Sequence, residues 1–196
     1  MSNRVFDESA KQRIAALVKG ALAIVPYDKQ ITIKFERVGA GTFDNQIIGA
    51  VCRNSHTIIV NVDWYENTTD DDIKFLLRHE ARHMYQMSQI EKLHTGEETQ
   101  EKVETIQQWA YEFMHYISNT PGKEIQHFQQ ECEQDAHVFA TFIANVENMD
   151  SEGVNLSWVD YPGIGDQIRD RVMYLFQKTP QEILMQYRDY YKAQRA

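Results

Sequence analysis

The feature that most constrains this chain is His79-Glu80-Ala81-Arg82-His83, an H-E-x-x-H motif inside a segment of helical character. Residues at i and i+4 lie one turn apart on the same helix face, so both imidazoles can reach one metal ion. Glu80 is turned slightly off that face, where it can hold a water on the metal. A zinc hydrolase needs these groups, together with a third ligand. The simpler alternative is a solvated helix face that carries His and Glu by chance.

Composition limits the class of protein. The chain has 196 residues, 42% of them hydrophobic and 11% aromatic, which is enough for one domain with a packed core. Its net charge of −9 and the lack of a basic run predict no binding to nucleic acid or to anionic membranes. No apolar run is long enough for a membrane span, and residues 1–8 lack the apolar core of a signal peptide. Cys52 and Cys132 are expected to be reduced thiols of a cytoplasmic protein.

Hydrophobic periodicity predicts a helix and then three strands before the motif. The helix covers residues 8–25 and ends at Pro26, and the strands lie at residues 31–36, 46–53 and 57–62. The motif helix then opens at residues 68–72, which offer a hydroxyl N-cap and three carboxylates at the positive end of the helix dipole. We expect it to run to about Glu91.

Helices dominate the rest of the chain. An apolar stripe of period 3.6 predicts a helix over residues 97–118, and a further long helix is expected over residues 123–146. Residues 148–165 are loop-like, and two short helices follow. The second of these carries a capping box that begins at Thr179. We therefore expect a core of residues 1–146 and a helical C-terminal extension, residues 147–196, that packs on the same domain.

A third ligand is expected from a later helix, and residues 131–140 hold the candidates. Here the chain resembles the gluzincin metallopeptidases, in particular the small minigluzincin and ImmA/IrrE-like types. Those families follow H-E-x-x-H with a helix reading approximately E-x-[E/D/Q]-A-x-x-F-A, whose first Glu binds zinc. The residues that match this second motif are Glu133, Asp135, Ala136, Phe139 and Ala140.

Glu131 is a rival to Glu133 as the third ligand. The two residues flank the apolar stripe of their helix on opposite sides, so periodicity does not choose between them. A row formed by Ala136, Ala140 and Ala144 lies next to Glu133. Small residues there would let the motif helix approach closely, and this favours Glu133.

The chain departs from the resembled pattern in three ways. Arg82 stands between the two histidines, a whole helix is inserted between the motifs, and His137 occupies a position where many relatives have an acidic residue. If that acid orients a ligand histidine in relatives, the role here must pass to another residue, for which Asp135 is the candidate.

Two readings of other classes stay open. One is a zincin-like binding or regulatory protein without turnover. The other is a di-iron carboxylate oxidoreductase, because Glu-x-x-His occurs three times: Glu80 to His83, Glu112 to His115, and Glu124 to His127. The predicted strands argue against a four-helix di-iron bundle.

The sequence thus predicts an α+β fold, with a small, mostly antiparallel three-stranded sheet packed against helices that carry both motifs. The resemblance implies a Zn²⁺-dependent metallopeptidase that acts on a peptide or protein. His79, His83 and Glu133 would bind the metal, and Glu80 would take a proton from the zinc-bound water and pass it to the leaving nitrogen. Tyr161, His137 and His115 are the candidates for stabilising the oxyanion. The sequence leaves the substrate and the oligomeric state open.

Overall fold

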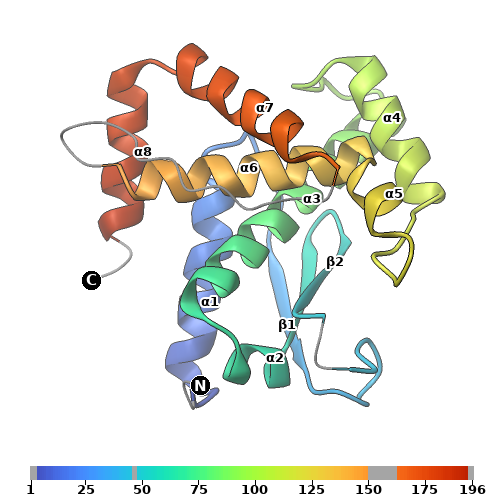
Figure 1. Ribbon diagram of the computed structural model, residues 1–196, viewed down its shortest axis with the longest axis vertical. Helices are drawn as coiled ribbons and strands as arrows, with labels where there is room; N and C mark the ends of the chain where they lie inside the picture. The colour runs from blue at the N-terminus through green and yellow to red at the C-terminus, as the bar shows by residue number, and fades with distance from the viewer. Residues whose placement is uncertain (1–3, 46–47, 150–162, 194–196) are drawn as a thin grey trace.

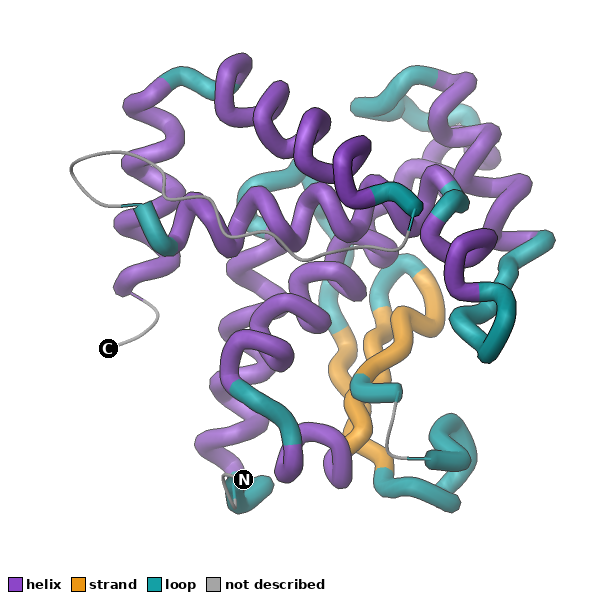
Figure 2. Tube along the Cα trace, in the orientation of Figure 1, coloured by secondary structure: helices purple, strands orange, loops and turns teal. Residues whose placement is uncertain are grey.

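The fold combines a small sheet with a larger set of helices. In this computed structural model of the protein, residues 4–45, 48–149 and 163–193 are described. The strands gather at one side of the molecule and helices make up the rest (Figure 2). The predicted α+β fold with a three-stranded sheet and a helical C-terminal extension is confirmed.

The sheet has the strand order β1-β3-β2. β1 (Thr32–Glu36) is parallel to β3 (Thr57–Asn61), and β2 (Ala50–Asn54) is antiparallel to β3. Every residue of β3 is buried, as expected for a central strand with a continuous apolar run. β2 forms one edge of the sheet, on the side where it contacts the motif helix.

Two helices precede the motif helix. α1 (Glu8–Leu22) is the expected N-terminal helix, with the Asp7 side chain as its N-cap. The short α2 (Val62–Asn67) was not expected. It begins directly after β3 because the Asn61 side chain accepts hydrogen bonds from the amides of Asp63 and Trp64.

The motif lies on α3 (Asp70–Thr95), the longest helix described. The Thr69 hydroxyl caps its start by accepting from the Asp72 amide at 3.1 Å, which confirms the predicted hydroxyl cap. At its end Gly96 adopts φ +75°, a left-handed conformation that glycine tolerates. α3 contacts α1, β2, α4 and α6, so the motif helix is the element around which the others pack.

The predicted helix over residues 123–146 is wrong in one respect, because the chain breaks it in two. α5 (Glu124–Phe128) ends before Gln130, which is extended, and α6 (Glu131–Glu147) starts after it. The Gln130 side chain bonds the backbone of Ile117, and the Glu112 carboxylate accepts from the first two amides of α6. Tertiary partners therefore satisfy the groups that an unbroken helix would have used. α4 (Val103–Met114) is shorter than the predicted helix over residues 97–118.

The extension consists of α7 (Gly165–Lys178) and α8 (Gln181–Ala193), which both contact α6. α7 runs along α6, and α8 turns back beside the C-terminal end of α6 (Figure 1). The Thr179 hydroxyl, expected to cap α8, donates instead to the Leu175 carbonyl at the end of α7. None of the helices among the described residues combines the length and apolar character that a membrane span requires.

A buried ion pair joins α3 to α6 immediately before the motif. Arg78 Nη2 lies 2.5 Å from Glu147 Oε2, and the two side chains are only 3% and 4% exposed. Lys74 Nζ lies 3.4 Å from the other carboxylate oxygen of Glu147, and the Arg78 guanidinium also lies over the Tyr191 ring of α8. This group of charges ties both helices to the extension.

We predict that Glu147→Gln lowers the free energy of unfolding by about 3–5 kcal/mol, since it leaves the buried Arg78 charge without its partner. Urea denaturation followed by circular dichroism measures this loss. Glu8→Gln is the matched control, because Glu8 pairs with Lys11 at the surface and its loss should cost under about 1 kcal/mol. Equal, small losses in both variants would contradict the structural role of the Arg78–Glu147 pair.

Candidate metal centre

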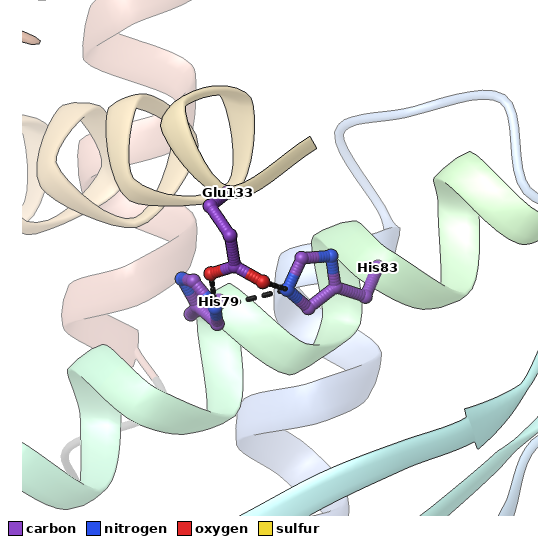
Figure 3. A group of neighbouring side chains, drawn as sticks. All are labelled: His79, His83 and Glu133. Carbon is purple, nitrogen blue, oxygen red and sulfur yellow. Dashed lines mark hydrogen bonds and ion pairs between the residues drawn. The ribbon is translucent and has the colours of Figure 1, made fainter. Parts of the chain in front are cut away.

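Three side chains from two helices converge on one point. His79 and His83 project from α3, and Glu133 reaches them from the first turn of α6 (Figure 3). The two Nε2 atoms lie 3.0 Å apart, and each is 3.3 Å from one oxygen of the Glu133 carboxylate. All three residues are buried, so this cluster could hold a metal ion.

The structure brings Glu133, and not Glu131, to the histidines. Glu131 Oε1 pairs with Arg171 of α7 at 2.9 Å, with its side chain 39% exposed, whereas the Glu133 side chain is 1% exposed. Ala136 and Ala140 are fully buried on the same helix. The predicted close approach of α3 and α6 along small residues therefore agrees with the position of Glu133.

The side chain of Gln86 sets the orientation of His83. Its amide nitrogen donates to the Cys132 carbonyl at 2.9 Å and to Asp135 Oδ2 at 2.7 Å, so its oxygen faces His83 Nδ1, at 2.8 Å. A carbonyl oxygen only accepts, hence His83 Nδ1 carries a proton and the neutral ring presents the Nε2 lone pair to the cluster. Histidines that bind metals are commonly oriented in this way.

Arg82 stabilises the same arrangement from α3. Its guanidinium donates to both oxygens of Asp135, at 2.7 and 3.1 Å, and lies over the rings of Tyr85 and Phe139. Burial tends to raise the pKa of Asp135, but the Arg82 charge outweighs burial and holds that pKa below its usual range. Asp135 is thus ionised and reaches His83 through Gln86. The ion pair between Arg82 and Asp135 therefore explains why an arginine stands between the two histidines of the motif.

The donor set fits a metal ion. Tetrahedral zinc with bonds of about 2.0–2.1 Å places its ligand atoms roughly 3.3 Å apart, close to the separations in the cluster. Without a cation, the His83 lone pair would face a carboxylate oxygen and a second imidazole. Burial lowers the pKa of His83, but Glu133 and Glu80 outweigh burial and raise it to about 9. In the metal-free protein a proton therefore occupies the place that a cation would take.

Glu80 is held beside the cluster by the edge strand. Its Oε2 accepts a hydrogen bond of 2.6 Å from the backbone amide of Cys52 in β2. Burial raises the pKa of Glu80, while the neighbouring His83 and His79 partly oppose that shift. A carboxylate in this environment is a stronger base than one in water, which suits proton transfer near neutral pH.

Two residues near Glu133 were not predicted from the sequence as parts of this site. The Tyr116 hydroxyl, in the loop between α4 and α5, donates to Glu133 Oε1 at 2.7 Å, and His127 Nε2 of α5 lies 3.4 Å from Oε2. Although the Tyr116 residue is 44% exposed, desolvation of its hydroxyl beside Glu133 and the Glu133 charge raise its pKa, so the phenol keeps its proton. No local pattern marks Tyr116, and the Glu-x-x-His pattern that marks His127 suggested a di-iron ligand instead; both residues lie between α3 and α6, and their place depends on how that segment folds back.

Of the three candidates for oxyanion stabilisation, His137 and His115 lie among the described residues. His137 is buried on α6, with its ring centroid 4.5 Å from that of His79. His115 is exposed and lies against the Tyr111 ring, 4.5 Å between centroids. Tyr161 lies outside the described residues. Of these candidates, the described structure places only His137 beside a residue of the cluster.

The other Glu-x-x-His pairs do not form a second cluster in the described part of the chain. The Glu112 carboxylate is occupied by the amides of Glu131 and Cys132, and His115 is exposed. His127 approaches Glu133 without its sequence partner Glu124, which is exposed. The second carboxylate-rich ligand set that a di-iron centre requires is therefore not assembled among these residues.

Comparison of this chain with family profiles, curated proteins and solved structures finds no match.

We predict that metal binding at pH 7 releases about one proton, because a cation must displace the proton that Glu133 and Glu80 hold on His83. The direction of the pH dependence of metal affinity follows from the raised pKa of His83. Below about 9 the His83 ring is protonated in the metal-free protein, so the apparent affinity should rise about tenfold per pH unit toward that value. Titration calorimetry in buffers of different ionisation enthalpy measures the protons released. An affinity independent of pH between 6 and 8 would contradict the arrangement.

Proposed function

We propose that this protein is a zinc-dependent hydrolase of the metallopeptidase type. The observation that carries the proposal is the convergence of His79, His83 and Glu133 in one buried cluster with Glu80 beside it. A peptide bond as the substrate rests on the resemblance of the two motifs to those of gluzincins.

Zinc is the metal we propose on the chemistry of the donors. Two imidazole nitrogens and one carboxylate form the protein ligand set of several catalytic zinc sites, which leave a further position open. Calcium and magnesium prefer sites made of oxygen ligands only. The absence of a thiolate from the cluster also argues against a closed structural zinc site, since those sites are built mainly from cysteines.

In the proposed hydrolysis, Glu80 transfers the proton and Gln86 orients a metal ligand. Bound zinc lowers the pKa of water and polarises a carbonyl group. Glu80 accepts a proton from the attacking water and returns it to the leaving amine, while the Cys52 amide holds one of its oxygens in place. Gln86 keeps His83 in the tautomer whose Nε2 faces the cluster. The burial of these groups strengthens their electrostatic interactions, because little water screens them.

A non-catalytic metal-binding protein is the second candidate, and the burial of the cluster favours it. His79, Glu80 and His83 are each less than 9% exposed in this structure. A scaffold needs no base, however, and burying a carboxylate at position 80 lowers the stability of the fold. Its presence is easier to explain if Glu80 takes part in a reaction. The two functions differ in what happens when only the charge of Glu80 is removed.

We predict about one zinc per chain in protein purified without a metal-affinity tag, as measured by mass spectrometry of the metal content. His79→Ala and Glu133→Ala should lose this zinc, because each removes one of three ligands. Glu131→Ala is the matched control and should keep it, since Glu131 pairs with Arg171. Zinc retained in Glu133→Ala but lost in Glu131→Ala would overturn the ligand assignment.

We predict that Glu80→Gln keeps its zinc and loses peptide hydrolysis by a factor of at least about 10², the usual contribution of a general base. The amide has nearly the same shape and can still accept from Cys52, so the fold should be unchanged. Cleavage of a denatured protein mixture, read by mass spectrometry of new termini, compares the variant with the native chain. Identical cleavage patterns in both would favour a scaffold or a contaminating protease over this mechanism.

A further inference from the structure

The inserted segment contacts the proposed metal ligand directly. The inserted segment comprises the residues between α3 and α6. Each oxygen of the Glu133 carboxylate faces one histidine of α3 and one group from this segment. Oε1 accepts from the Tyr116 hydroxyl at 2.7 Å, and Oε2 lies 3.4 Å from His127 Nε2. Both carboxylate oxygens therefore have a neighbour from this segment, and the Tyr116 hydroxyl is the one that donates a hydrogen bond.

The loop that carries Tyr116 is fixed at the next residue. The Gln130 side chain accepts from the Ile117 amide at 2.9 Å and donates to the Ile117 carbonyl at 3.0 Å. His127 Nδ1 lies 2.9 Å from the same carbonyl, and a carbonyl only accepts, so this nitrogen is the donor. Three hydrogen bonds thus connect this loop to the chain just before α6.

The segment also fixes the turn of α6 on which Glu133 stands. The Glu112 carboxylate of α4 accepts from the amides of Glu131 and Cys132, at 2.9 and 2.8 Å. A negative charge at this place is favoured by the helix dipole as well as by the two hydrogen bonds. Both the backbone of this turn and the side chain of Glu133 are consequently positioned by residues that the zinc motif does not include.

We propose that Tyr116 is a positioning residue of the metal centre, whose hydroxyl holds the Glu133 carboxylate in the orientation from which it can bind the ion, and that His127 acts indirectly by fixing the loop that carries Tyr116. A glutamate side chain has three rotatable bonds, and a carboxylate that accepts from a fixed hydroxyl keeps fewer of the orientations that these bonds allow. The inserted helices are then part of the metal centre, and they do more than cover it. The proposal rests on the proposed metal-binding function and extends it to the inserted segment.

Tyr116→Phe tests the proposal, because it removes one hydroxyl and leaves the ring in place. Zinc affinity is measured by competition with a chromophoric chelator, and the ligand geometry by the visible absorption of the Co²⁺-loaded protein. We expect a Kd for zinc about 10–100 times higher than in the native chain, as for other residues that orient metal ligands, and a changed Co²⁺ spectrum. Tyr111→Phe is the matched control, since Tyr111 is an exposed tyrosine of the neighbouring α4 and the variant should leave both unchanged.

His127→Gln serves as the second variant, and it keeps the test decisive if Tyr116→Phe does not fold. The glutamine amide can still donate to the Ile117 carbonyl and fix the loop of Tyr116, so this variant should weaken zinc binding less than His127→Ala does. Native affinity and a native Co²⁺ spectrum in both Tyr116→Phe and His127→Ala would overturn this inference and leave the proposed function intact. A native chain that binds no zinc would overturn both.

Discussion

The contact between α3 and α6 is the interaction on which the site depends. The motif helix supplies two imidazoles, but an ion bound by these alone would lack a charged ligand and a closed environment. α6 supplies the carboxylate and contacts α3, and its small residues Ala136 and Ala140 are fully buried. Two arginines of α3 then fix how the helices pack. Arg82 pairs with Asp135 near the start of α6, and Arg78 pairs with Glu147 at its end.

Burying so many ionisable groups is costly unless each one has a partner. The structure meets this condition for Asp135, His83, Glu133 and Glu80 with linked contacts, whereas His79 Nδ1 is buried without a hydrogen-bond partner among the described residues. Arg82 neutralises Asp135, Asp135 accepts from Gln86, and Gln86 orients His83. Glu133 has the histidines on one side and Tyr116 on the other, and Glu80 has the Cys52 amide. The ligand geometry is therefore maintained by the core of the protein, and the position left for a cation is part of the same network.

Local patterns in the sequence predicted the parts that depend on local rules. The helix of the motif, its Thr69 cap and the buried β3 follow from spacing and propensity. Glu133 could be preferred over Glu131 because the neighbouring alanines indicated which face meets α3. The break at Gln130 could not be predicted, since it depends on contacts with Ile117 and Glu112 from a different element. Tyr116 and Gln86 were missed for the same reason: their partners are distant in sequence or reached only through tertiary packing.

The central claim is that zinc binds to two imidazoles and one carboxylate in this cluster. X-ray absorption at the zinc edge of the native protein tests this claim most directly, because it reports the ligand atoms themselves. We predict only nitrogen and oxygen neighbours at about 2.0–2.1 Å, with the multiple scattering of about two imidazoles. Sulfur at about 2.3 Å, which would place the ion on Cys52 or Cys132, would contradict the account.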